Sequence, residues 1–144
     1  MEPVDYQRVH DSAIRSIEEV LPEAERLKVQ IGIENVWNRF LLDPVSMCRF
    51  IDHFSSDYIK SYFDVGNVML YGHPEDWIRT LGPRIAAVHM KDFRRNVGNL
   101  DGFVDLLAGD VDFSSLMKTF ADIGYSGPYT VEYVPPTPGA AEKG

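Results

Sequence analysis

Four residues that can bind a metal ion each follow a short apolar run. Glu34 comes after KVQIGI, Asp64 after IKSYF, His89 after IAAV and Glu132 after YTV. Three carboxylates brought together repel one another unless a cation holds them. Three carboxylates with one imidazole suit Mn²⁺, Mg²⁺, Co²⁺ or Zn²⁺, and the absence of a cysteine ligand argues against a structural zinc site. The pattern therefore predicts a divalent-metal site, provided that the four residues converge.

The apolar runs have the length and alternation of β-strands. We expect strands over residues 29–34, 58–64, 85–89 and 129–133. Side chains alternate between the two faces of a strand, and in each run the regularly spaced apolar residues occupy the face opposite the polar one. The four polar residues should therefore project from the same face, at the same end of the sheet.

Helical patterns separate these strands. We expect helices over 5–21, with an interruption and a short restarted turn at Pro22, from Asp43-Pro44 onward, over 74–81, and from Asp112 to Gly124, with a long loop over 93–110. Strands that alternate with helices in this way form parallel βα units. In a barrel of such units, active-site residues lie at the carboxyl ends of the strands.

Composition narrows the class of protein. The 144 residues suit one domain, and we expect it to span 1–134, followed by a small, polar and disordered tail over 135–144. The net charge of -8 argues against binding to nucleic acid. The sequence contains no run of 18 apolar residues, so we expect no transmembrane helix. The single Cys48 excludes an internal disulfide and fits a reducing cytosol, so we expect a cytoplasmic protein.

Each of the four residues also has a simpler interpretation. A carboxylate at the end of one strand is usually a helix cap or a solvated charge, and a lone histidine there is more often structural than a ligand. The same feature at the end of every expected strand is harder to explain in that way.

The motifs around these residues resemble those of a known superfamily. The segments IGIENVWNRF, SYFDVGNV, VHMKDFRR, AGDVDF and YTVEY resemble the xylose-isomerase-like barrels, which include AP endonuclease family 2. The likeness is greatest to sugar-phosphate isomerases and epimerases, such as L-ribulose- or L-xylulose-5-phosphate 3-epimerases and hexulose-6-phosphate isomerases. It covers residues 5–134 and implies an α/β fold, with parallel (β/α) units corresponding to the second half of a TIM (β/α)8 barrel.

The resemblance implies a role for each of the four residues. Glu34, Asp64, His89 and Glu132 would bind the metal, and Glu34 and Glu132 would also exchange protons with the substrate. In the family mechanism one glutamate removes a proton next to the ketose carbonyl, giving a cis-enediolate, and the other returns a proton to the opposite face. The implied activity is that of a metal-dependent ketose-phosphate 3-epimerase.

Further residues acquire roles by the same resemblance. The implied substrate contacts are Asn67, Arg95, Trp37 and Asn38, and the groups expected to orient the site from outside are Lys91 and Asp92. The expected partner is a sugar or a sugar phosphate.

Several alternatives stay open at this stage. The same site could run an aldose–ketose isomerisation, and the chain could be a truncated, non-catalytic binding or assembly module. The AP endonuclease branch is disfavoured by the negative charge. A four-stranded parallel sheet leaves two edges and an inner face uncovered, so we expect a homo-oligomer or pairing with a separate N-terminal half-barrel.

Overall fold

The computed structural model describes residues 5–132, so the tail expected to be disordered lies outside the described residues. The elements are α1 (Tyr6–Leu27), β1 (Ile31–Glu34), α2 (Pro44–His53), β2 (Ile59–Asp64), α3 (Val65–Val68), α4 (Pro74–Leu81), β3 (Ile85–Met90), β4 (Asp92–Phe93), β5 (Phe103–Val104), α5 (Phe113–Asp122) and β6 (Tyr129–Val131), with 3-10 turns over Gly82–Arg84 and Leu100–Gly102. Within this range, no helix is long and apolar enough to cross a membrane.

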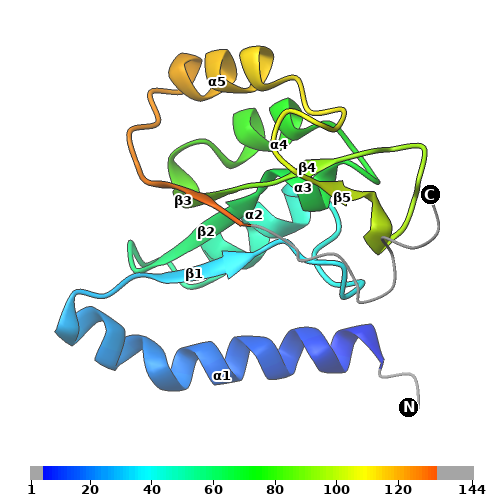
Figure 1. Cartoon of the computed structure of the whole chain (residues 1–144). Coiled ribbons are helices and arrows are strands. Elements are labelled where there is room, and N and C mark those ends of the chain that lie inside the picture. Colours follow the sequence, from blue (N-terminus) through cyan, green and yellow to red (C-terminus); the bar gives the residue numbers. More distant parts are fainter. Residues whose placement is uncertain (1–4, 133–144) are drawn as a thin grey trace.

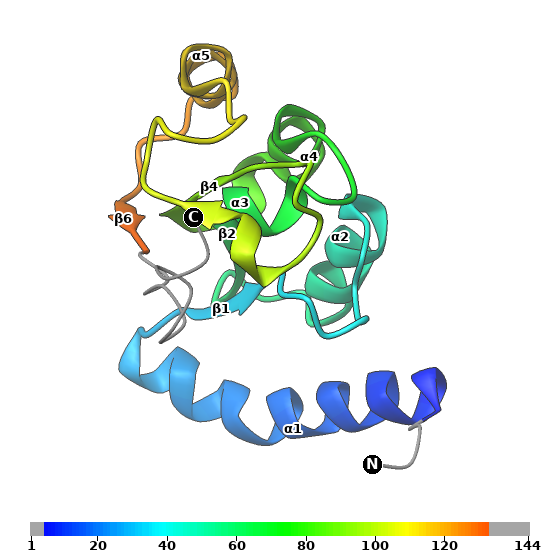
Figure 2. The same ribbon diagram turned by 45° about the vertical axis from the view of Figure 1, so that its right-hand side comes forward.

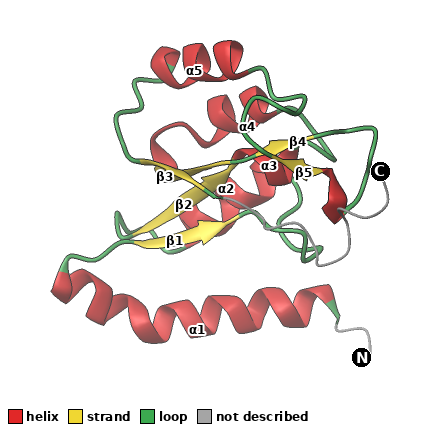
Figure 3. Ribbon diagram, in the orientation of Figure 1, coloured by secondary structure: helices red, strands yellow, loops and turns green. Residues whose placement is uncertain are grey.

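The main sheet has four parallel strands in the order β1-β2-β3-β6 (Figure 3). Glu34 pairs with Tyr62 between β1 and β2, Asp64 pairs with His89 between β2 and β3, and His89 pairs with Thr130 between β3 and β6. All four strands therefore end at the same edge of the sheet. This confirms the predicted α/β fold of alternating parallel units.

The hydrophobic core lies between the sheet and helices α2, α4 and α5, which are grouped beside it in Figure 1. In β2, Ile59, Ser61 and Phe63 are buried, whereas Lys60 and Tyr62 between them are half-buried. Burial thus alternates along the strand, with the apolar side chains toward the core, as the sequence pattern predicted. The opposite face carries the polar strand ends.

Aspartate caps begin the helices where the sequence predicted them. Asp43 accepts a hydrogen bond from the Ser46 amide at 2.9 Å, with Pro44 as the first helical residue of α2. Asp112 accepts one from the Ser115 amide at 3.0 Å at the start of α5. A carboxylate in this position satisfies an amide that has no partner within the helix.

Helix α1 lies below β1, separated from α5 by the rest of the molecule (Figures 1 and 2). The interruption predicted at Pro22 is wrong, because one helix runs from Tyr6 to Leu27 with Pro22 inside it. Ile14, Ile17 and Leu21 pack against the core. This packing offsets the hydrogen bond that a proline inside a helix cannot make.

Two further boundaries differ from the sequence prediction. The first strand begins at Ile31, because Val29 lies outside the sheet and is 56% exposed. The loop expected over 93–110 contains a small antiparallel ribbon, in which Phe93 pairs with Phe103. Strands of two residues are too short to leave a periodic signal in the sequence.

Candidate metal centre

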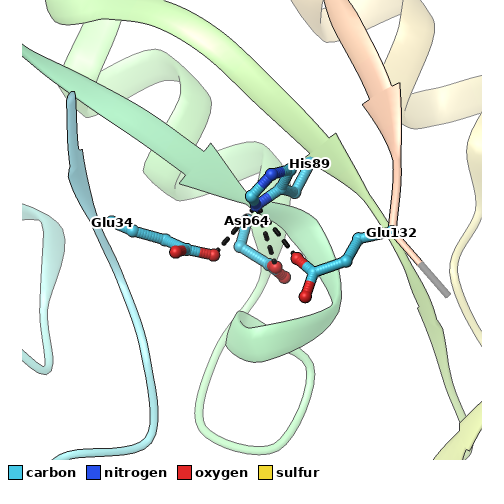
Figure 4. A group of neighbouring side chains, drawn as sticks. All are labelled: Glu34, Asp64, His89 and Glu132. Atoms are coloured by element: carbon cyan, nitrogen blue, oxygen red, sulfur yellow. Dashed lines mark hydrogen bonds and ion pairs between the residues drawn. The ribbon is translucent and has the colours of Figure 1, made fainter. Parts of the chain in front are cut away.

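Glu34, Asp64, His89 and Glu132 meet at the carboxyl edge of the sheet. Glu34 and Asp64 are the last residues of β1 and β2, His89 is in β3, and Glu132 directly follows β6. One ligand atom from each lies within 4.8 Å of every other. Figure 4 shows the three carboxylates directed toward the His89 ring from separate strands. Sheet register alone brings these distant residues together, because parallel strands carry their ends to one edge.

The His89 ring nitrogen Nδ1 is the centre of this group. It lies 2.9 Å from Glu34 Oε1, 3.0 Å from Glu132 Oε2 and 3.8 Å from Asp64 Oδ2. Oxygen and nitrogen ligands at about 2.1 Å from an ion stand roughly 3.0–3.5 Å apart in octahedral or tetrahedral geometry. The four groups are therefore close enough together to hold one divalent cation.

The two carboxylate oxygens of Asp64 have different surroundings: one caps a helix and the other faces the candidate metal centre. Its Oδ1 accepts a hydrogen bond from the Asn67 amide at 2.8 Å, which caps α3. Its Oδ2 is buried and lacks a hydrogen bond among the described residues. Burial raises the pKa of Asp64 to about 6, although the Lys91 ammonium lowers it in part. A buried carboxylate oxygen without a hydrogen bond suits a cation.

Lys91 supplies a positive charge beside the cluster. Its Nζ lies 3.0 Å from both Asp64 Oδ2 and Glu132 Oε2. Lys91 therefore forms an ion pair with each of these two oxygens. Burial works to lower the pKa of Lys91, but the two carboxylates outweigh it and the pKa is raised. Lys91 therefore offsets part of the negative charge of the cluster.

Lys91 also requires a glycine nearby. A Cβ placed on Gly66 would lie 2.5 Å from the Lys91 Cβ. The short helix α3 can therefore approach β3 only if this position lacks a side chain.

Glu34 and Glu132 are the accessible members of the group. Their side chains are 32% and 40% exposed, whereas Asp64 is fully buried. The Glu132 amide donates to the Met90 carbonyl at 3.2 Å, which extends the pairing of β6 by one residue. The two glutamates come from the outer strands of the sheet, so they approach the centre from opposite sides (Figure 4).

Tyr62 is a further residue of the site, and its role there was not predicted from the sequence. Its ring centroid lies 4.0 Å from that of His89, with 33° between the ring planes. Its hydroxyl donates to Thr130 Oγ1 at 3.2 Å. Tyr62 thus supports the imidazole from the inner face and connects β2 to β6. Tyr62 stands two residues before Asp64, so the two share one face of the strand. This spacing could have indicated that Tyr62 lies beside the site.

Three of the residues implied as substrate contacts, Trp37, Asn38 and Arg95, form hydrogen bonds within the protein. Trp37 donates from Nε1 to the Asn67 carbonyl at 2.8 Å. Asn38 is exposed and accepts from the Phe40 amide at 2.9 Å. Arg95 donates from its guanidinium to the Gly72 carbonyl at 3.0 Å. Asn38 and Arg95 are thus exposed, whereas Trp37 is half-buried.

Asp92 anchors the loop that precedes α5. Its carboxylate accepts hydrogen bonds from the amides of Phe93, Gly109 and Val111 at 2.8–3.1 Å. A Cβ on Gly109 would overlap this carboxylate. Asp92 therefore fixes the backbone beside the site through its hydrogen bonds to this loop.

The fold and the site define a class of protein. The family model of the xylose isomerase-like TIM barrel matches residues 2–144. The chain therefore belongs to this family, as its motifs predicted.

Two individual relatives are similar to this chain over most of its length. An L-ribulose-5-phosphate 3-epimerase, UlaE, of Salmonella paratyphi C is 28% identical over 135 residues, which cover 90% of this chain and 46% of that protein. An uncharacterised protein of Methanocaldococcus jannaschii is 27% identical over 128 residues, covering 85% and 43%. The chain thus spans less than half the length of these relatives.

Solved structures agree on the fold. The structure of a D-psicose 3-epimerase of Clostridium cellulolyticum H10 with D-tagatose is similar to this chain, with a TM-score of 0.77 and 19% identity. The match covers 91% of this chain and 44% of the epimerase chain. The IolI protein with a bound zinc atom matches 94% and 51%, with a TM-score of 0.76 and 19% identity. At such identities the likeness shows the architecture, which is part of a TIM barrel.

Proposed function

We propose that this chain carries the metal-binding and proton-transferring half of a ketose or ketose-phosphate 3-epimerase. One observation carries the proposal: three carboxylates from three strands surround a single imidazole nitrogen, with a glutamate on either side. The similarity to an L-ribulose-5-phosphate 3-epimerase supports the choice of substrate class. We assign Glu34, Asp64, His89 and Glu132 as the metal ligands.

The two glutamates fit the proton transfers of an epimerisation. Inversion at a carbon requires a base on one face and an acid on the other. Glu34 and Glu132 come from strands at opposite edges of the sheet and are both accessible to solvent. A bound divalent ion would supply the Lewis acidity that stabilises negative charge on the substrate oxygens. Mn²⁺, Mg²⁺, Co²⁺ and Zn²⁺ all suit this donor set.

The remaining residues would shape the site around the substrate. In this proposal Trp37, Asn38 and Arg95 line the approach to the strand ends, while Lys91 offsets the carboxylate charge. Lys91 lies within 3.0 Å of two of the ligands, which is the position of a group that orients and balances them.

Solvent exchange tests the reaction. With Mn²⁺ and L-ribulose 5-phosphate in deuterated water, we expect deuterium to enter at C3. Entry at C1 or C2 would instead indicate an aldose–ketose isomerase on the same site. Glu132→Gln should abolish exchange, whereas Asp122→Asn, an exposed change in α5, should leave it intact. Exchange that is equal in Glu132→Gln and the unchanged chain would refute the assignment.

Substrate turnover requires a wall on the open side of the sheet. β1 and β6 each pair with one neighbour among the described residues, and Val131 of β6 is 63% exposed. We propose that residues 1–134 act as one half-barrel and that four further parallel strands close it, from a second copy or from a separate N-terminal half. Closure would satisfy both edges and enclose the site.

Light scattering distinguishes the two sources of these strands. A dimer of the chain with one Mn²⁺ per protomer would support closure by a second copy. A monomer that becomes active only when an N-terminal half-barrel is added would support the other source. A monomer that binds no metal would refute both the closure and the metal site.

A further inference from the structure

Two buried asparagines connect the first two strand ends of the candidate metal centre. Asn35 directly follows Glu34, and Asn67 lies one helical turn after Asp64. Both side chains are at least nine-tenths buried, with exposed fractions of 5% and 9%. A buried amide side chain is costly unless its polar atoms are bonded, so the partners of these two indicate what they do.

The side chain of Asn35 replaces the next residue of a strand. Backbone pairing between β1 and β2 ends at Glu34 and Tyr62. Beyond that point, Asn35 Oδ1 accepts from the Asp64 amide at 2.8 Å, and Asn35 Nδ2 donates to the Asp64 carbonyl at 2.8 Å. These are the donor and acceptor that a continuing parallel strand would offer. Without Asn35, two buried backbone groups of a metal ligand would have no partner here.

Asn67 completes the connection from the other side. Its Nδ2 donates to the Asn35 carbonyl at 2.9 Å, and its own carbonyl accepts from Trp37 Nε1 at 2.8 Å. The segment after β1 is therefore bonded to the turn after β2 at four points. The same segment continues through Arg39 and Leu41, whose φ angles of 66° and 52° are unusual for residues with side chains.

We infer that Asn35 and Asn67 form a lock that sets the separation of Glu34 and Asp64, and that Asn35 is a positioning residue of the metal centre. This inference rests on the proposed metal site. Glu34 gains its position from β1, but β1 ends at that residue, so its side chain projects from the last paired position. Asn35 restrains the chain immediately after it and fixes Asp64 in the same contact. A shift at this junction would move two of the four ligands relative to His89.

The lock also gives Asn67 a defined role. Its side-chain amide donates to Asn35 rather than toward the open face of the sheet. We therefore assign Asn67 to positioning, in place of the substrate contact implied by its sequence motif.

Calorimetric titration of the full chain with Mn²⁺ tests the lock. Asn35→Ala should raise the Kd by about 10–100-fold, as is typical when a residue that orients ligands is removed. Asn67→Ala should act in the same direction. Both residues act on one junction. The loss of affinity in the double variant should therefore be smaller than the sum of the losses in the two single variants.

Two controls separate positioning from general destabilisation. Asn99→Ala removes an asparagine that caps an exposed turn, and it should leave the Kd unchanged. Ile78→Val removes a methylene group from the core in α4, and it should lower Tm without changing the Kd. An Asn35→Ala protein with lower Tm but the Kd of the unchanged chain would overturn the inference.

Hydrogen exchange keeps the lock testable without metal. The Asp64 amide should be protected in the unchanged chain and exchange at least tenfold faster in Asn35→Ala. If the unchanged chain binds no Mn²⁺, the proposed function fails, and loss of this protection still shows that Asn35 holds the junction. Equal protection in both proteins would refute the lock itself.

Discussion

The buried carboxyl group of Asp64 makes a quantitative prediction about pH and stability. Its pKa is raised from 3.8 to about 6 in the folded protein, chiefly by burial. The folded state therefore binds a proton more tightly than the unfolded state does. Protonation stabilises the metal-free fold, so this contribution is fully present below pH 3.8 and is lost as the pH rises through 6.

The size of the effect follows from the shift in pKa. A rise of about two units corresponds to about 3 kcal/mol in the free energy of unfolding. The free energy of unfolding of the metal-free protein should decrease between about pH 4 and pH 6.5. Bound Mn²⁺ should reverse the trend, since it requires the ionised carboxylate and its binding grows stronger as the proton leaves. At 100 times its Kd, the ion adds about 2.7 kcal/mol.

Urea unfolding at pH 4.5, 5.5 and 6.5 measures this directly. In EDTA the unchanged chain should lose stability across the series relative to Asp64→Asn, which cannot ionise at this position. Mn²⁺ should stabilise the unchanged chain most at pH 6.5 and the variant little at any pH. If the two proteins show the same pH dependence in EDTA, the assigned burial effect on Asp64 is refuted.

Three further changes follow from the packing. Lys91→Met should lower metal-free stability by about 3 kcal/mol in urea unfolding, because Asp64 and Glu132 lose their shared buried cation; Mn²⁺ should restore most of it. Gly66→Ala should cost about 2 kcal/mol in the same assay, since its Cβ would press on Lys91, whereas Gly72→Ala, whose Cβ meets its nearest atoms at 3.6 Å, should be close to neutral. Pro22→Ala should raise Tm and add about 2 kcal/mol by restoring a helical hydrogen bond in α1, and an unchanged Tm would contradict the continuous helix.

Much of the fold was predictable because its signals are local. The alternation of apolar residues identified all four strands of the sheet to within two residues at each described end. Asp43 and Asp112 marked helix starts, because a cap is a contact between residues three positions apart. The side-chain parity that placed the four polar strand ends on one face needed only the period of a strand.

Other features were missed because they depend on contacts between distant residues. Pro22 reads as a helix break, and only packing of the α1 apolar face on the core explains why the helix continues. Asn35 looks like an ordinary loop residue until the Asp64 backbone is placed beside it. Tyr62 gains meaning only when β3 brings the His89 ring against it.

The sequence by itself determined the class of fold and the four polar residues at the strand ends, because strand periodicity and helix caps operate over a few residues. Tertiary structure decided how those residues meet. The parallel register brings three carboxylates to within 3.8 Å of His89 Nδ1, buries Asp64 fully and sets Lys91 between two of the ligands. Distances and burial of this kind arise from long-range packing, which no local pattern encodes.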